Sequence, residues 1–205
     1  MIKIDHISYS MLSLWLSCRQ CFIRHYVNHE PQPPFQPFID GIKAHENAHA
    51  YHTDGEYDEE FLEPYTEKYD PDYRTISETK FRSDMALWDW QSPVPIVGII
   101  DGIRENEVVD LKYSKSAPKL AKNMQGILYS WLVFKFKNEM PLFTINHWHK
   151  ETNKIKNRSI EYTKDDIRWL MGVIDKFWKE INQDDIFIAG KPGAWNHRYP
   201  DCPFQ

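Results

Sequence analysis

Two carboxylates and a lysine stand within two short apolar stretches in the middle of the sequence. Residues 97–103 contain Asp101, and residues 108–112 contain Asp110 followed two positions later by Lys112. Both stretches are rich in β-branched residues and are separated by four polar residues, a pattern that predicts a β-hairpin. Because strand side chains alternate between faces, we expect Asp110 and Lys112 to point to the same side of their strand.

These residue types are suited to metal-dependent hydrolysis. Carboxylates bind hard divalent cations, which activate water and stabilise charge on a phosphate. A lysine can orient the water or neutralise the developing oxyanion. An Asp-x-Lys sequence is common, and most exposed pairs of this kind contribute little. Here the charges are embedded in apolar strands, where a charge is costly unless it is paired or bound to a metal. The surroundings therefore favour a catalytic role.

The composition is that of one α/β domain. The chain has 205 residues, of which 41% are hydrophobic, enough for a sizeable core. No stretch approaches the roughly 18 apolar residues of a membrane span, and the first residues lack a signal pattern. We therefore expect a protein of the cytoplasm with no membrane contact. Three cysteines, Cys18, Cys21 and Cys202, are a poor basis for a disulfide framework.

The net charge of −5 conceals an uneven distribution. Residues 54–72 hold nine acidic side chains and one base, and without them the chain has 21 acids and 24 bases. Residues 111–137 contain six lysines and no acid. Lys115, Lys119 and Lys122 follow the candidate site directly, and Lys119 and Lys122 are expected to share one face at the start of a helix. A basic surface beside the site predicts contact with a phosphate backbone.

Hydrophobic periodicity predicts alternating helices and strands. Helices are expected at residues 8–28, 38–52, 120–137 and 163–183. Strands are expected at residues 76–85, 97–103, 108–112, 143–149 and 154–162. The organisation expected is a single domain at residues 1–205, with an N-terminal helical part at 8–52, an acidic loop, insertion or short exposed helix at 54–72, a sheet with an embedded helix at 74–162, and a C-terminal helix and tail at 163–205.

A second metal-binding pattern lies in the predicted helix at residues 38–52. The five residues from His45 to His49 read His-Glu-Asn-Ala-His, which meets the H-E-x-x-H pattern of zinc metalloproteases. The two histidines are one turn apart and share a helix face. A zinc protease would need a third ligand elsewhere, and this interpretation leaves Asp101, Asp110 and Lys112 without a role.

The order of the motifs resembles the PD-(D/E)XK nuclease superfamily in its RecB-like branch, which includes the nuclease domains of recombination helicases and the CRISPR-associated adaptation exonucleases. The usual marks are a serine-flanked first helix that ends near a cysteine, then Gly-x-x-x-His, Gly-x-x-Asp, Asp-x-Lys and Gln-x-x-x-Tyr. In this sequence they stand at residues 8–18, 41–45, 98–101, 110–112 and 125–129. The resemblance covers residues 8–130 and implies a restriction-endonuclease-like fold, a mixed central β-sheet flanked by α-helices.

The resemblance also implies residue roles. Asp101, Asp110 and Lys112 would be catalytic. The metal ligands, for Mg²⁺ or Mn²⁺, would be His45, Asp101, Asp110 and the Leu111 carbonyl. Supporting residues would be Glu78 on the preceding strand and Gln125 and Tyr129 on the following helix. Lys115, Lys119 and Lys122 are the candidate nucleic-acid-binding residues from the charge pattern.

The cysteines depart from the family pattern. Many relatives hold an iron–sulfur cluster with one cysteine near the first helix and three near the C-terminus, and a [4Fe–4S] cluster normally takes four thiolates. This chain has only Cys18, Cys21 and Cys202, so no such cluster is expected. A zinc site formed by these cysteines with His197 has suitable ligand types, and buried thiols without a metal are the alternative.

These observations predict a divalent-metal-dependent deoxyribonuclease, more an exonuclease than a sequence-specific endonuclease. Its partner would be DNA, single-stranded or at duplex ends, in DNA processing, recombination or repair, together with proteins of those pathways. The alternative is a catalytically inactive protein of the same fold that binds nucleic acid or a partner.

Overall fold

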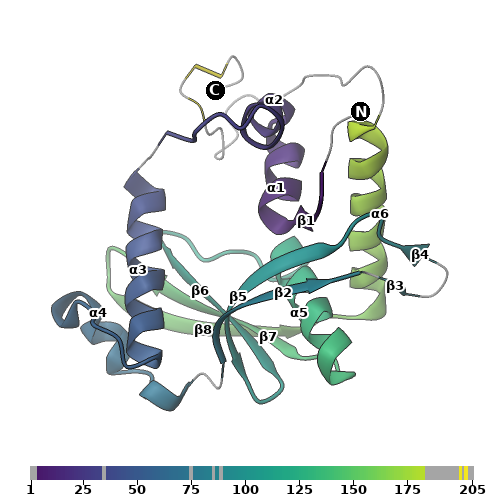
Figure 1. Ribbon diagram of the computed structural model, residues 1–205. Coiled ribbons are helices and arrows are strands. Elements are labelled where there is room, and N and C mark those ends of the chain that lie inside the picture. Colours follow the sequence, from purple (N-terminus) through teal and green to yellow (C-terminus); the bar gives the residue numbers. More distant parts are fainter. Residues whose placement is uncertain are drawn as a thin grey trace. The chain divides into compact units, whose positions relative to one another are not determined.

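The structure, a computed structural model, describes residues 4–33, 36–73, 76–84, 86–87, 90–182, 199 and 201–202 (Figure 1). The chain divides into two units. Unit 1 consists of Met1–Pro34, Arg82–Val97 and Arg168–Gln205. Unit 2 consists of Phe35–Phe81 and Gly98–Ile167. All the predicted catalytic and metal-binding residues belong to unit 2, and the three cysteines belong to unit 1.

Unit 2 is built on a mixed sheet. The strands that follow one another in space are β5 (Ile96–Arg104), β6 (Glu107–Ser114), β7 (Leu142–His149) and β8 (Lys154–Glu161), and β2 (Ile76–Ser83) also pairs with β5. The β5–β6 pair is antiparallel, as the predicted hairpin requires, and so is the β7–β8 pair, whereas β6 and β7 run parallel. The predicted fold class, a mixed central sheet flanked by helices, is confirmed.

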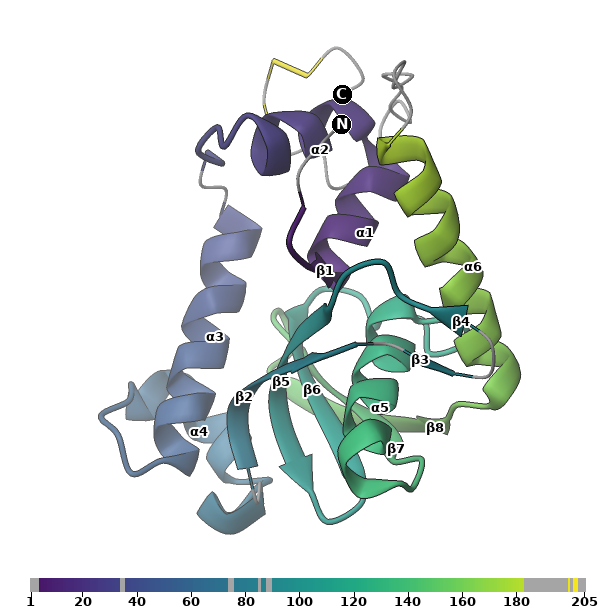
Figure 2. The same ribbon diagram turned by 45° about the vertical axis from the view of Figure 1, so that its right-hand side comes forward.

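Helices cover both faces of this sheet (Figure 2). The helices α3 (Gln36–His52) and α4 (Glu59–Thr66) pack on one face, in an apolar cluster whose members include Ala44, Ala48, Leu111 and Trp148. The helix α5 (Met124–Lys137) packs on the other face, where Gly126 touches the ring of Phe143. Strand alternation explains this division, because Phe143 and Trp148 are an odd number of residues apart on β7 and so point to opposite faces.

The helix α5 begins four residues later than its periodicity suggests. Asn123 is extended (φ −73°, ψ 103°), and its side chain accepts a hydrogen bond from the Gly126 N–H and donates one to the Lys119 carbonyl. This N-cap ends the preceding loop, in which Lys122 has a positive φ of 52°. The prediction that Lys119 and Lys122 share a helix face is therefore wrong, because both precede the helix.

The acidic segment at residues 54–72 is only partly a loop. It forms α4 and a short 3₁₀ helix, η2 (Pro71–Tyr73). Asp58 caps α4 by accepting the Phe61 N–H, and the exposed acids occupy the outer side. Leu62 and Tyr65 are fully buried against the sheet, so the segment contributes to the core as well as to the acidic surface.

Unit 1 contains the first helices and most of the last one. Ser8, the first residue of the helix predicted at residues 8–28, is the N-cap of α1 (Tyr9–Ser17), and its side chain accepts the Met11 N–H. The single helix predicted for residues 8–28 is wrong: Cys18 is extended (φ −154°, ψ 102°) and separates α1 from α2 (Arg19–Phe22), which a π-helix, η1 (Ile23–Val27), continues.

The remaining elements of unit 1 are short strands and the last helix. The strand β1 (Ile7–Ser8) pairs in parallel with the first residues of β5, and β3 (Ala86–Leu87) pairs with β4 (Trp90–Gln91). The helix α6 (Lys164–Ile181) starts at a capping box between Thr163 and Asp166. Among the described residues, no helix has both the length and the apolar composition needed to cross a membrane.

Replacing two helical glycines, Gly126 and Gly172, with alanine should change the stability of the protein in opposite directions. A Cβ on Gly126 would lie 2.5 Å from the Tyr162 hydroxyl and 2.7 Å from the Phe143 ring, whereas nothing lies within 4 Å of a Cβ on Gly172 of α6. Tyr162 cannot move away easily, because it is buried and donates to the Leu120 carbonyl. We expect Gly126→Ala to cost about 1–3 kcal/mol of unfolding free energy and Gly172→Ala to add about 0.5–1 kcal/mol.

Denaturant unfolding followed by circular dichroism measures both values. If Gly126→Ala were as stable as the wild type while Gly172→Ala showed the expected gain, the tight packing between α5 and β7 would be contradicted.

Candidate active site

Asp110 is the most deeply buried charged residue of the candidate site. It lies near the middle of β6, and its exposed fraction is 0%. One carboxylate oxygen, Oδ1, accepts a hydrogen bond from the Lys112 ammonium group at 2.9 Å. The other, Oδ2, is buried and has no hydrogen-bond partner among the described residues. A buried carboxylate oxygen without a partner is costly, and a cation is one partner that would satisfy it.

Asp101 of β5 forms a hydrogen bond to β6 at the point where the pairing of these two strands ends. The residue pairs between β5 and β6 run from Arg104↔Glu107 to Gly102↔Val109, one position before Asp101 and Asp110. The Asp101 carboxylate accepts the backbone N–H of Leu111 at 2.8 Å. A side chain thus takes the place of a backbone acceptor where the strands separate, and this contact brings the second carboxylate to the strand that carries Asp110.

His45 approaches the carboxylates from α3. Its Nδ1 lies 3.4 Å from Oδ2 of Asp101. The helix is held in place because Ala44 and Ala48, one turn apart, are fully buried in the cluster that contains Leu111. Lys150 anchors the start of the same helix through a 3.1 Å ion pair with Asp40. The exposed fraction of the His45 side chain is 28%, so its ring stays accessible to solvent.

The electrostatic environment raises the pKa of both members of the Asp110–Lys112 pair. Burial raises the pKa of Asp110 to about 6, although the positive charge of Lys112 opposes the shift. Burial alone would lower the pKa of Lys112, but the negative charges of Asp110 and Asp101 outweigh it, so this pKa lies above its usual value. Lys112 is therefore fully charged at neutral pH, and Asp110 gives up its proton at a higher pH than an ordinary aspartate does.

Gln125 and Tyr129 lie one turn apart on α5, and both are buried. The Gln125 amide donates a hydrogen bond to the Tyr129 hydroxyl at 3.2 Å. Burial raises the pKa of Tyr129, and the nearby charge of Asp110 adds to the shift. The tyrosine therefore stays a neutral hydroxyl beside Asp110. A Cβ on Gly98 would lie 2.9 Å from its ring, so this glycine lets β5 approach α5 closely.

The donor set fits a hard divalent cation in its chemistry. Two buried carboxylates and an imidazole are ligand types that Mn²⁺ accepts, and the carboxylates suit Mg²⁺. Within the part of the chain that the structure describes, however, only the three cysteines bring three metal-binding atoms within 4.8 Å of one another. The candidate ligands His45, Asp101 and Asp110 do not form such a group, and Oδ1 of Asp110 is already in contact with Lys112.

Other predicted site residues lie elsewhere in unit 2. Glu78 is on β2, but its side chain lies outside the described residues. Lys115 forms a 2.6 Å ion pair with Glu151, and Lys119 and Lys122 are exposed in the loop before α5. The Leu111 side chain is fully buried among apolar residues, while its backbone N–H contacts Asp101. The roles of all these residues stay predictions.

The zinc-protease interpretation gains no support from this geometry. His45 and His49 both lie on α3 as the pattern predicts. No third metal-binding atom, however, joins them within 4.8 Å in the described parts of the chain. His45 instead contacts Asp101, a residue that this interpretation leaves without a role.

His147 is a neighbour of the site that the sequence did not reveal. It lies on β7 opposite Lys112, with an exposed fraction of 5%. One ring nitrogen, Nε2, lies 3.1 Å from the Ser114 carbonyl, and burial lowers the pKa of His147. It is therefore a neutral imidazole at pH 7. Its position follows from the parallel register of β6 and β7, which no local pattern in the sequence specifies.

Several solved structures resemble this chain, and they include the following two. One is a protein of Eubacterium rectale named "Putative exonuclease", with a TM-score of 0.62 and 13% sequence identity, over 86% of this chain and 80% of that one. The other is SSO0001, with a TM-score of 0.51 and 15% identity, over 91% of this chain and 81% of that one. No family model and no curated protein matches the sequence. At these identities the likeness shows a shared fold.

Proposed function

We propose that this protein is a divalent-metal-dependent nuclease that hydrolyses phosphodiester bonds in DNA. The observation that carries the proposal is the pair of buried carboxylates, Asp101 and Asp110, beside the charged Lys112 at the end of the β5–β6 pairing. The name of the Eubacterium rectale neighbour, "Putative exonuclease", supports the same class of reaction. The order of the sequence motifs supports the RecB-like branch of the PD-(D/E)XK nucleases.

Each residue has a task in this proposal. Asp101, Asp110, His45 and the Leu111 carbonyl would hold Mg²⁺ or Mn²⁺. The metal, when bound, would supply an activated water and stabilise negative charge on the phosphate. Lys112 keeps its positive charge at neutral pH, so it can orient the attacking water or neutralise the oxyanion. Tyr129 and Gln125 would hold α5 against the active site or touch the DNA strand.

A cavity of about 440 Å³ borders α3 with Phe38, Ile42 and His45 in its lining. We propose an exonuclease acting on strand ends in DNA processing, recombination or repair, because no part of the sequence resembles a dedicated recognition domain. End-labelled single-stranded, duplex and circular DNA, each incubated with Mg²⁺, Mn²⁺ or EDTA, tests the proposal. Linear DNA should be degraded with metal and circular DNA spared, whereas intact DNA in every reaction would favour the alternative of an inactive nuclease fold.

Mn²⁺ should support cleavage at least as well as Mg²⁺. His45 brings an imidazole to a site whose other donors are oxygens, and Mn²⁺ tolerates nitrogen ligands more readily than Mg²⁺ does. The ratio of the Mn²⁺ and Mg²⁺ rates should therefore fall when His45 is changed to Gln, with His49→Gln as the matched control on the same helix. If Mg²⁺ were clearly superior and His45→Gln left both rates unchanged, His45 would not be a ligand.

DNA binding should weaken steeply with salt despite the net charge of −5. Each phosphate neutralised contributes about −0.9 to the slope of log K against log salt for duplex DNA and about −0.7 for single strands. Engagement of Lys115, Lys119 and Lys122 predicts a slope of roughly −2 to −3. The ion pair of Lys115 with Glu151 is exposed on both sides, so it costs little to exchange for a phosphate.

The triple alanine variant of these three lysines should flatten that slope without changing metal binding. The matched control replaces three other exposed lysines, Lys154, Lys176 and Lys179, and so removes the same charge elsewhere. Fluorescence anisotropy of labelled DNA over a salt series measures the slopes. An equal slope in the two triple variants would mean that the DNA path avoids the loop before α5.

A further inference from the structure

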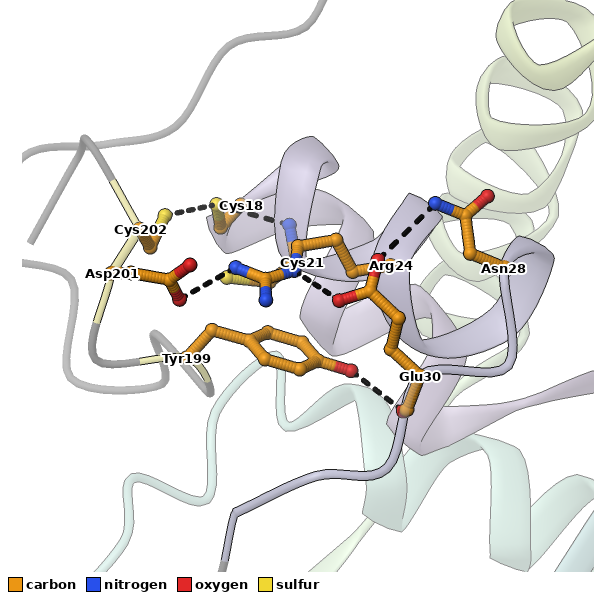
Figure 3. Close-up of polar contacts among 8 residues, drawn as sticks. All are labelled: Cys18, Cys21, Arg24, Asn28, Glu30, Tyr199, Asp201 and Cys202. Atoms are coloured by element: carbon orange, nitrogen blue, oxygen red, sulfur yellow. Dashed lines mark hydrogen bonds and ion pairs between the residues drawn. The ribbon is translucent and has the colours of Figure 1, made fainter.

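Three cysteines from the two ends of the chain meet in the interior of unit 1. Cys18 separates α1 from α2, Cys21 lies in α2, and Cys202 follows Cys18 by 184 positions. Their exposed fractions are 0%, 0% and 4%, and none of them is in a disulfide. Their sulfur atoms all lie within 4.8 Å of one another, and those of Cys18 and Cys202 are 3.5 Å apart (Figure 3).

We propose that Cys18, Cys21 and Cys202 bind one Zn²⁺ ion. Zinc–sulfur bonds of about 2.3 Å in tetrahedral geometry place two sulfurs roughly 3.8 Å apart, close to the separations in this cluster. Two of the ligands, Cys18 and Cys21, have the Cys-x-x-Cys spacing that is typical of zinc sites. Thiolates are soft ligands, which prefer zinc to magnesium or calcium.

The backbone around Cys18 is shaped for a sulfur ligand. The extended conformation of Cys18 ends α1, and its sulfur accepts the N–H of Cys21 at 3.4 Å as the N-cap of α2 (Figure 3). A donor directed at a sulfur stabilises negative charge there, as the contacts around metal ligands commonly do. The break in the helix therefore points the Cys18 sulfur at the residue that would share its metal ion.

A separate group of contacts holds Cys202 against this pair. Arg24 forms ion pairs with Glu30 at 2.6 Å and with Asp201 at 2.7 Å. Its guanidinium lies 4.0 Å from the centre of the Tyr199 ring, and the Tyr199 hydroxyl donates to the Glu30 carbonyl at 2.8 Å (Figure 3). The third ligand is therefore positioned by its neighbours, so that zinc would bind to preformed thiols and close a very long loop of chain.

The number of cysteines favours a zinc ion over an iron–sulfur cluster at this site. A [4Fe–4S] cluster normally takes four thiolates, and the whole chain has three cysteines. Zinc accepts three thiolates and completes its tetrahedron with a different fourth ligand such as water or an imidazole. His197, the fourth ligand suggested by the sequence, lies outside the described residues. The zinc site is independent of the proposed nuclease function, because its residues belong to unit 1 and the carboxylates to unit 2.

Metal analysis of the full-length protein tests this proposal. The protein is expressed in medium containing both zinc and iron, purified without chelators, and measured by mass spectrometry of its metals. We expect about one zinc per chain, and at least tenfold less in Cys18→Ser, Cys21→Ser and Cys202→Ser. Ser17→Ala, a change beside Cys18 that leaves all three thiols, is the matched control and should keep its zinc.

A second measurement on the wild type keeps the test valid if the cysteine variants fail to fold. After the native metal is removed, Co²⁺ should give the thiolate charge-transfer bands and the intense visible absorption of a tetrahedral site, and Zn²⁺ should displace it. Titration of thiols in denaturant should find three. Four results would each overturn the proposal: no metal and no cobalt bands, iron with sulfide in place of zinc, a disulfide between two cysteines, or unchanged zinc in folded cysteine variants.

Discussion

We expect Asp110→Asn and Lys112→Ala each to abolish DNA cleavage, with a loss of about a thousandfold or more. With asparagine at position 110, the site would bind the cation weakly. The enzyme would then lose both the activation of water and the stabilisation of charge on the phosphate. The Lys112→Ala variant would lack the ammonium group, whose nitrogen lies 2.9 Å from Oδ1 of Asp110. Several kcal/mol of transition-state stabilisation correspond to about three powers of ten in rate.

Initial rates on end-labelled DNA measure this loss, and circular dichroism shows whether the variants remain folded. Asp54→Asn and Lys154→Ala are the matched controls, since they make the same chemical changes at exposed positions. Asp54 has a positive φ of 54°, which asparagine adopts readily. Near-normal turnover by both Asp110→Asn and Lys112→Ala would contradict the assignment of the active site.

Asp110→Asn should also make the metal-free protein more stable at neutral pH. Burial raises the pKa of Asp110 to about 6, from about 3.9 in an unfolded chain. A carboxyl whose pKa is raised on folding contributes full stability below its unfolded pKa and loses it as the pH rises through its folded pKa. At pH 7.5 the ionised carboxylate therefore costs free energy that a neutral amide avoids, of order 1–3 kcal/mol.

The pH dependence of the stability difference is an internal control for this prediction. The difference in unfolding free energy between Asp110→Asn and the wild type, measured with EDTA present, should be largest above pH 7 and should close as the pH falls toward 4. A variant less stable than the wild type at every pH would mean that the loss of the Lys112 partner outweighs the burial of the charge. If Asp110→Asn is more stable than the wild type only in the absence of metal, the buried carboxylate lowers the stability of the metal-free protein and is retained for metal binding.

The sequence specifies the hairpin and the placement of its charged residues because alternation is local. Asp110 and Lys112 lie two apart on one strand, and that spacing alone places them on one face. The start of the first helix is likewise a local signal, because a serine, Ser8, precedes the apolar residues and caps α1. The contact between Asp101 and the Leu111 N–H depends on where two strands separate, which is a property of the tertiary fold.

Three other features of the structure depend on tertiary interactions that the hydrophobic periodicity of the sequence does not indicate. The helix predicted at residues 8–28 breaks at Cys18, where the sulfur caps α2, and a cysteine is not a recognised N-cap residue. The apolar stripe predicted for α5 underestimates its burial, because residues 124–133 are all buried. The proximity of Cys202 to Cys18 spans almost the whole chain, and neither spacing nor hydropathy encodes a contact at that distance.

The most direct test of the central claim is the anomalous scattering of a crystal soaked in Mn²⁺. The account predicts a manganese peak within coordination distance of the carboxylates of Asp101 and Asp110, with the His45 ring turned toward it. The soaked Asp110→Asn crystal should lack this peak. A wild-type crystal with no manganese at these carboxylates, at a concentration that supports DNA cleavage, would contradict the assignment of this site as the metal centre.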